Sequence, residues 1–178
     1  MNFLILPGIG DSDQSHWQTQ WEQSSPNFSR VIQDDWTNPD CQQWMARLEE
    51  AILQSGPDTI LVAHSLGCLL VSHWAASSSL PIKGALLVAP PDPMAEVFPV
   101  EARSFSDFPR RALNFKSMLI ASANDPYAQI EFSKQCASDW DSQFICIGDA
   151  EHINGSSNLG EWVVGKAMLQ QLLEQIKA

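Results

Sequence analysis

Ser65 stands in a pattern that could turn its hydroxyl into a nucleophile. The pentapeptide Ala63-His64-Ser65-Leu66-Gly67 lies between an apolar run at 59–63 and a helix-like segment that extends to about residue 77. The general Gly-x-Ser-x-Gly pattern places its serine on a strained turn between a strand and a helix, with the hydroxyl exposed. Gly67 fits this pattern, and Ala63 replaces the first glycine with another small residue. We therefore predict that Ser65 is a nucleophile.

A serine hydroxyl is a weak nucleophile and needs a base, for which the chain offers four histidines. In folds that present the serine on such a turn, the acid and then the histidine follow it along the chain. His16 and His64 precede Ser65, and His73 lies inside the helix expected after it. His152 alone lies far downstream, in a loop after the last expected strand. It is the predicted base.

The acid that orients His152 should follow a strand between the serine and the histidine. Asp125 meets this condition, because it ends an apolar run and is followed by Pro126. Asp92, which follows the strand before, is the rival candidate. Asn-Asp-Pro is also simply a good turn sequence. We predict Asp125 as the residue that holds the His152 tautomer and stabilises its imidazolium form.

Two backbone amides are expected to form an oxyanion hole. The Leu66 N–H would lie at the N-terminus of the helix after Ser65, where the helix dipole favours negative charge. A second donor should come from a loop after an earlier strand, here residues 7–10, with Ile9 preferred and Gly10 as the alternative. The two glycines of this loop lack the third glycine of a dinucleotide-binding motif, so a nucleotide site is not predicted.

Short apolar runs alternate with segments of helical period, as in a parallel sheet flanked by helices. Strands are expected at residues 2–6, 30–34, 59–63, 84–89, 117–121 and 143–147, and helices at 15–23, 41–54, 66–77, 127–138 and 159–176. This order predicts an α/β protein of the α/β-hydrolase fold, with a compact six-stranded parallel sheet and helices on both faces. We expect one domain over residues 1–178.

The segment 90–111 is rich in proline, yet also apolar. Long loops of this kind are usually functional. Phe98, Phe105 and Phe108 could wall an acyl pocket, or they could merely cover the sheet edge. Only about 27 residues separate the fourth and fifth strands, too few for a cap domain, so we expect a shallow site that prefers short acyl chains.

Composition excludes several other classes of function. The net charge is −11 with ten Lys and Arg, which argues against nucleic acid and against an anionic membrane surface. No apolar stretch approaches the ~20 residues that span a bilayer, and the N-terminus lacks the basic start of a signal peptide. The four cysteines are scattered and are expected to be buried free thiols. We predict a cytoplasmic protein with no metal and no organic cofactor.

Several motifs together resemble a known family. They are Pro-Gly-x-Gly near the N-terminus, Ser15-His16-Trp17, His64-Ser65-Leu66-Gly67, Asn124-Asp125-Pro126 and Glu151-His152-Ile153-Asn154. The chain is similar over nearly its whole length to the small serine hydrolases that include retinoblastoma-binding protein 9. The resemblance implies a cap-less α/β-hydrolase in which Ser65, Asp125 and His152 form the triad. It favours His16 as a pocket residue that binds substrate, with a partly buried histidine bonded to the backbone as the alternative. Ala63 departs from many relatives, which have glycine there.

The sequence thus predicts a serine hydrolase that cleaves small carboxylic esters, or related acyl substrates, through an acyl-enzyme. Its expected partner is a small-molecule acyl substrate, and we expect a monomer or a weak homodimer. The alternative is a non-catalytic interaction protein that keeps the hydrolase fold. The presence of all three residues, Ser65, Asp125 and His152, argues against that alternative.

Overall fold

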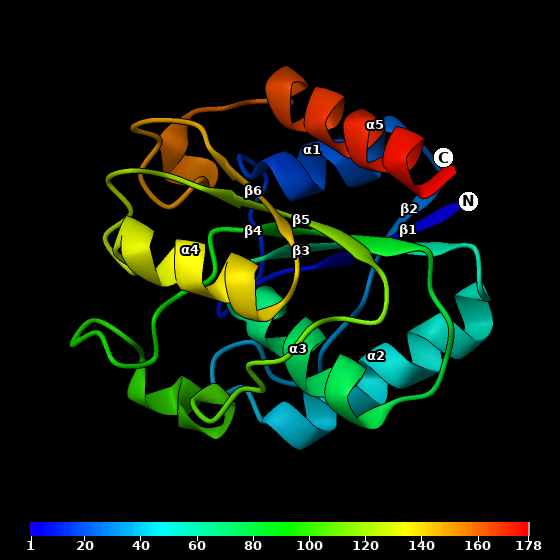
Figure 1. Cartoon of the computed structure of the whole chain (residues 1–178), viewed down its shortest axis with the longest axis horizontal. Helices are drawn as coiled ribbons and strands as arrows, with labels where there is room; N and C mark the ends of the chain where they lie inside the picture. The colour runs from blue at the N-terminus through cyan, green and yellow to red at the C-terminus, as the bar shows by residue number, and fades with distance from the viewer. Residues whose placement is uncertain (178) are drawn as a thin grey trace.

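The computed structural model describes residues 1–177 and shows a central parallel sheet between two layers of helices (Figure 1). Six strands lie in the order β2-β1-β3-β4-β5-β6, and all neighbours are parallel. The strands are β1 (Asn2–Leu6), β2 (Phe28–Arg30), β3 (Thr59–His64), β4 (Gly84–Val88), β5 (Lys116–Ala121) and β6 (Gln143–Cys146). The predicted fold class, an α/β-hydrolase fold with a six-stranded parallel sheet, is confirmed.

The helices cover both faces of the sheet. They are α1 (Trp17–Ser24), α2 (Cys41–Ser55), α3 (Leu66–Ser77), α4 (Ile130–Asp139) and α5 (Val163–Lys177), with short 3₁₀ helices η1 (Val100–Phe105) and η2 (Gly155–Ser157). In Figure 1, α1 and α5 lie above the sheet, and α2, α3 and α4 lie below it. Consecutive side chains on each strand point to opposite faces, so each strand contributes to both layers of the core.

Two apolar clusters fill the space between sheet and helices. The cluster under α2, α3 and α4 takes alternate strand residues such as Leu61 and Ala63, whereas the cluster under α1 and α5 takes Ile60 and Val62. Such strands, buried on both faces, read as continuous apolar runs, which is why most of them could be located from the sequence. The parallel arrangement brings the carboxyl ends of the strands, and the loops that follow, to one edge of the sheet.

The second strand was predicted in the wrong place. The apolar pair at 31–32 suggested a strand at 30–34, but β2 spans Phe28–Arg30. Its position is set by tertiary contacts: Phe28 stacks on Phe3 of β1, with ring centroids 4.5 Å apart. A three-residue edge strand carries too little pattern for sequence reasoning to find.

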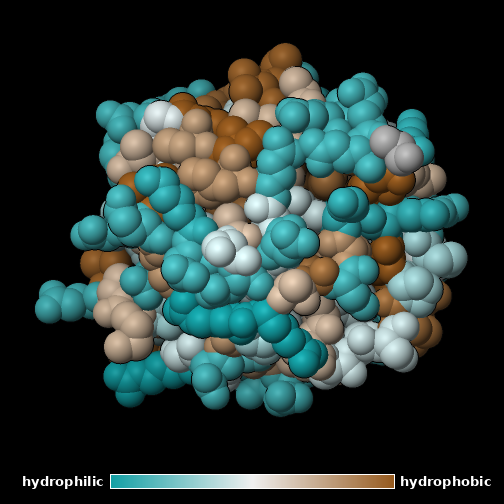
Figure 2. All heavy atoms as spheres, in the orientation of Figure 1, coloured by the Kyte–Doolittle hydropathy of each residue, from teal (hydrophilic) through white to brown (hydrophobic). Residues whose placement is uncertain are grey.

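The surface shows two further features. Hydrophilic residues cover much of the face drawn in Figure 2, while apolar atoms gather at its top over the start of α5, where Val163 and Val164 are exposed.

Cys41, Cys68 and Cys136 are buried, but Cys146 is exposed, so the expectation of buried thiols is wrong there. Cys146 ends β6, the edge strand, which has no neighbour on one side. Within residues 1–177, no helix has the length and apolar character needed to cross a membrane.

Candidate active site

Ser65 occupies a sharp turn between β3 and α3. Its backbone has φ 54° and ψ −124°, a conformation that costs an L-residue roughly 1–3 kcal/mol and tends to occur at functional sites. The turn requires small neighbours. A side chain on Gly67 would collide with the carbonyl oxygen of Leu6, and a methyl group on Gly8 would lie 2.8 Å from Ser65 Cβ. The loop after β1 therefore packs directly against Ser65.

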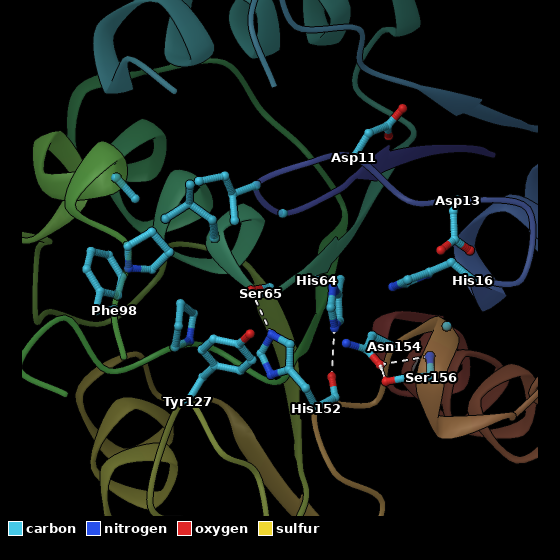
Figure 3. Close-up of a pocket in the computed structure, with 17 residues that line it drawn as sticks. Asp11, Asp13, His16, His64, Ser65, Phe98, Tyr127, His152, Asn154 and Ser156 are labelled. Carbon is cyan, nitrogen blue, oxygen red and sulfur yellow. Dashed lines mark hydrogen bonds between the residues drawn. The ribbon is translucent and has the colours of Figure 1, made fainter. Parts of the chain in front are cut away.

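A chain of hydrogen bonds joins Ser65, His152 and Asp125 (Figure 3). The distance from Ser65 Oγ to His152 Nε2 is 2.9 Å. His152 Nδ1 lies 2.9 and 3.0 Å from the two carboxylate oxygens of Asp125, which can only accept. Nδ1 therefore carries the hydrogen, and Nε2 is free to accept the proton of the Ser65 hydroxyl. The structure thus brings together all three residues predicted for the triad.

Asp92, the rival for the acid, lies elsewhere. Its carboxylate accepts a hydrogen bond from the Met94 amide, and its own amide donates to the carbonyl of Tyr127. No contact between Asp92 and His152 is found in the part of the chain that the structure describes. Asp92 therefore shapes the start of segment 90–111 and does not reach the base.

Ser65 and His152 open into a cavity of about 290 Å³. Ile9 and Leu66 both line it, and within residues 1–177 the amide of neither donates a hydrogen bond. The alternative donor, the Gly10 N–H, is already bonded to the carbonyl of Trp36 at 2.8 Å. The amides of Ile9 and Leu66 are therefore the ones available to an oxyanion, and the dipole of α3 adds to the effect at Leu66.

Of the three phenylalanines expected at the pocket, only Phe98 lines it. The prediction is wrong for the other two. Phe105 is fully buried and packs against Trp44 at a ring-centroid distance of 5.4 Å, and Phe108 packs against Trp140 at 5.8 Å. For Phe105 the cause is η1, which packs against α2 and α3. Phe108 lies beyond η1 and is held by Trp140 and Phe132 in the α4 region.

His64 and His16 extend from His152 as a row of imidazoles. The ring centroids of His152 and His64 are 4.9 Å apart, and those of His64 and His16 are 4.7 Å apart. His64 Nε2 lies 2.9 Å from the carbonyl oxygen of His152, so this nitrogen donates and fixes the backbone that carries the base. Burial lowers the pKa of His64 well below its usual value and that of His16 to about 4, so both rings are neutral near pH 7. His16 lines the pocket, as predicted.

Sequence reasoning missed several residues at the site, of which three lie close to His152 or its loop. Tyr127 lines the pocket, and its ring centroid lies 4.4 Å from that of His152. Asn124 and Ser122 accept hydrogen bonds from the amides of Glu151 and Ala150, at 2.8 and 2.9 Å. The position of Asn124 beside Asp125 was the one available signal for its role. The predicted pairing of Asp125 with His152 implies that the two loops meet, but it does not say which neighbouring side chains bond the loop amides.

Comparison with known proteins places this chain in a family. The sequence model of the family described as serine hydrolase matches residues 3–171. A YdeN-like hydrolase from Pectobacterium atrosepticum is 30% identical, with a TM-score of 0.88 over 98% of this chain and 91% of the other. The chain belongs to the serine hydrolase family. The predicted family of small serine hydrolases with the α/β-hydrolase fold is thereby confirmed.

More distant structures share the fold. The ydeN gene product of B. subtilis is 18% identical, with a TM-score of 0.77 over 97% of this chain and 98% of the other. A monoacylglycerol lipase from Paleococcus ferrophilus is 12% identical, with a TM-score of 0.73 over 97% and 93% of the two chains. A search of curated protein sequences gives no match. These two structures share the fold of this serine hydrolase over nearly its whole length.

Proposed function

We propose that this serine hydrolase cleaves small carboxylic esters through an acyl-enzyme, with Ser65 as nucleophile, His152 as base and Asp125 as the orienting acid. The observation that carries the proposal is the hydrogen-bonded chain from Ser65 Oγ through His152 to Asp125, which opens into the cavity. A hydroxyl bonded to a neutral imidazole, itself held by a buried carboxylate, is the arrangement that acyl transfer needs.

In the first half-reaction, Ser65 Oγ attacks the ester carbonyl carbon and its proton moves to His152 Nε2. The carbonyl oxygen becomes an oxyanion that accepts from the amides of Ile9 and Leu66. Asp125 stabilises the imidazolium. The tetrahedral intermediate then collapses, the bond to the alcohol oxygen breaks, and that oxygen leaves with the proton from Nε2.

In the second half-reaction, water takes the place of the alcohol. His152 Nε2 accepts a proton from the water as its oxygen attacks the acyl carbon. Collapse of the second intermediate breaks the bond to Ser65 Oγ, which recovers its proton, and the carboxylic acid leaves. Tyr127, whose ring packs on His152, limits the movement of the imidazole between the two steps.

The size of the cavity supports a small substrate. Its volume of about 290 Å³ lies at the lower end of the roughly 300–1,000 Å³ of drug-sized sites. Phe98, Pro99 and Ala102 form an apolar wall for the acyl chain. Each buried methylene should add about 0.8 kcal/mol until this wall ends. On a series of p-nitrophenyl esters, kcat/KM should rise over the first few carbons and then fall, whereas a steady climb to long chains would contradict a short pocket.

The decisive experiment is the substitution Ser65→Ala. It removes the attacking oxygen, so turnover of p-nitrophenyl butyrate should fall by about 10⁴–10⁶. A fluorophosphonate probe should label Ser65 of the unaltered protein, seen as a mass increase on the peptide that contains it, and should leave the variant unlabelled. An unlabelled protein without esterase activity would favour the alternative, a non-catalytic interaction protein with this fold. Activity of the variant within tenfold of the unaltered protein would place the nucleophile elsewhere.

A further inference from the structure

The cavity has two chemically different sides, which Figure 3 shows on either side of Ser65. Phe98, with Pro99 and Ala102 from the same segment, lines one side. On the other side lie His16, Asp13, Asn154 and Ser156, contributed by the loop after β1 and by the segment that follows His152. Neither the hydrogen-bonded chain nor the predicted oxyanion amides use the polar groups of this second side. Its side chains are therefore free to select a substrate.

His16 places a buried hydrogen-bond donor on the polar side. The residue is only 4% exposed, and its Nδ1 accepts from the Gln18 amide at 3.1 Å, as the N-cap of α1. An imidazole that is neutral and accepts at Nδ1 carries its hydrogen at Nε2. Within residues 1–177 this buried Nε2 has no hydrogen-bond partner. A buried donor without a partner costs free energy, so the site is suited to a ligand that supplies the acceptor.

Asp13 adds an acceptor on the same side of the cavity as this donor. Its carboxylate accepts from the amide and hydroxyl of Ser15, at 2.8 and 2.6 Å, and these bonds lower its pKa, so it is ionised near pH 7. Asp11, also at the cavity, is paired with Arg30 at 2.6 Å. A hydroxyl group matches this pair of neighbours, because it can accept from His16 Nε2–H and donate to a carboxylate. An anionic group would meet the repulsion of Asp13.

The polar side lies next to the position of the leaving alcohol. The alcohol oxygen must reach His152 Nε2 to receive its proton. Residues 154–156, which begin two positions after His152 in the chain, line the cavity. The row of imidazoles leads from His152 to His16. The apolar side at Phe98 remains for the acyl chain.

We propose that the polar side of the cavity binds the alcohol part of the ester and that His16 Nε2–H donates a hydrogen bond to a hydroxyl group on it. The substrates are then esters of small hydroxylated alcohols. This inference rests on the proposed ester hydrolysis, and it adds the chemical class of the leaving group and the residue that selects it.

The test uses two esters that differ only in one terminal group, propyl butyrate and 2-hydroxyethyl butyrate. The unaltered protein should show the higher kcat/KM on the hydroxyethyl ester. In His16→Asn, which keeps an oxygen that can cap α1 but withdraws the donor from the cavity, the ratio of the two values should fall by about three- to tenfold. His16→Phe, which removes the donor but keeps a ring, should give the same fall, so the result does not depend on one variant folding.

A matched control is His73→Asn. His73 is on α3, outside the cavity, with Nε2 3.2 Å from the carbonyl of Phe105, and its loss should leave the ratio unchanged. An unchanged ratio in both His16 variants, with Ser65 still labelled by the fluorophosphonate, would overturn the inference and leave ester hydrolysis standing. The inference would also be overturned if the His16 variants instead lowered kcat/KM on propyl 4-hydroxybutyrate relative to propyl butyrate. The hydroxyl site would then belong to the acyl chain. Absence of both labelling and hydrolysis would overturn the proposed function and this inference together.

Discussion

Two segments leave the same edge of the sheet and meet at Ser65, but different forces hold them. Residues 148–156, which carry His152, are held by directional hydrogen bonds: Ser122 and Asn124 accept from two of its amides, and His64 and Trp17 donate to two of its carbonyls. Residues 90–111 also make hydrogen bonds, such as the one from Trp140 Nε1 to the Pro109 carbonyl, but they add the burial of two aromatic rings, Phe105 and Phe108, in the core.

The difference matches what each segment must do. In the proposed mechanism, proton transfer from Ser65 to His152 depends on their 2.9 Å contact, and directional bonds help to hold the loop at that distance. In this loop two residues other than glycine have positive φ values, 50° at Glu151 and 48° at Ile153, and such strained positions persist only when their surroundings fix them. A wall for an acyl chain needs only the right shape, which non-directional apolar burial can provide.

The comparison of the two segments predicts the largest loss of kcat for a substitution at Asp125. Asp125→Asn would place an amide where the carboxylate holds the His152 N–H, favouring the wrong tautomer, so kcat should fall by about 10⁴ with little change in unfolding by urea. The control Asp92→Asn alters the other segment and should keep kcat within a few fold. A larger loss for Asp92→Asn would mean that the acid has been assigned to the wrong strand.

The next largest effect is expected on the stability that residues 90–111 give to the fold. Phe105→Ala should leave a cavity between η1, α2 and α3 and lower the free energy of unfolding by about 3–5 kcal/mol, measured by urea denaturation. The kcat of the protein that remains folded should change little. Phe98→Ala is its counterpart, since Phe98 lines the cavity and should shift the preferred acyl length. Equal changes in acyl preference for both variants would contradict the conclusion that Phe98 lines the cavity and Phe105 only supports the core.

Loss of one hydrogen bond to the segment that carries His152 should lower kcat more than it lowers stability. Asn124→Ala removes the acceptor for the Glu151 amide and frees the backbone next to His152. We therefore expect kcat to fall by up to about 10², while the equilibrium constant of unfolding changes by a smaller factor. Asn27→Ala is a suitable control, because Asn27 is exposed near the start of β1, at the opposite edge of the sheet. A variant that loses stability and keeps its kcat would show that Asn124 supports the fold and not the position of the base.

The smallest expected effect is the loss of folding stability at acid pH that His16 causes. The folded protein holds the pKa of His16 at about 4, below its value of 6.5 in an unfolded chain. Between these values the unfolded state binds a proton that the folded state does not, so stability falls as pH falls from 7 towards 4. His16→Asn should therefore lose less stability than the unaltered protein between pH 7 and 5, by on the order of 1–2 kcal/mol in urea titrations. Identical losses would show that His16 is not held neutral.

The amino-acid sequence was sufficient to predict the α/β class, five of the six strands, and the choice of Ser65, Asp125 and His152, which the structure brings together. These predictions rest on local information. Buried parallel strands are continuous apolar runs, the turn after β3 needs small residues around Ser65, and parallel strands bring the loops that follow them to one edge. Chain order then leaves few choices for the base and the acid.

Only the tertiary structure decided which neighbours those residues have. Nothing local distinguishes Phe98, which lines the cavity, from Phe105 and Phe108, which pack into the core, because the outcome depends on how Phe105 docks against Trp44 and Phe108 against Trp140. For His16, the local contact with the Gln18 amide sets the tautomer. Its burial and the free Nε2–H arise from packing across the fold, in part against His64. Side-chain environments of this kind are set by long-range packing, which short-range pattern does not encode.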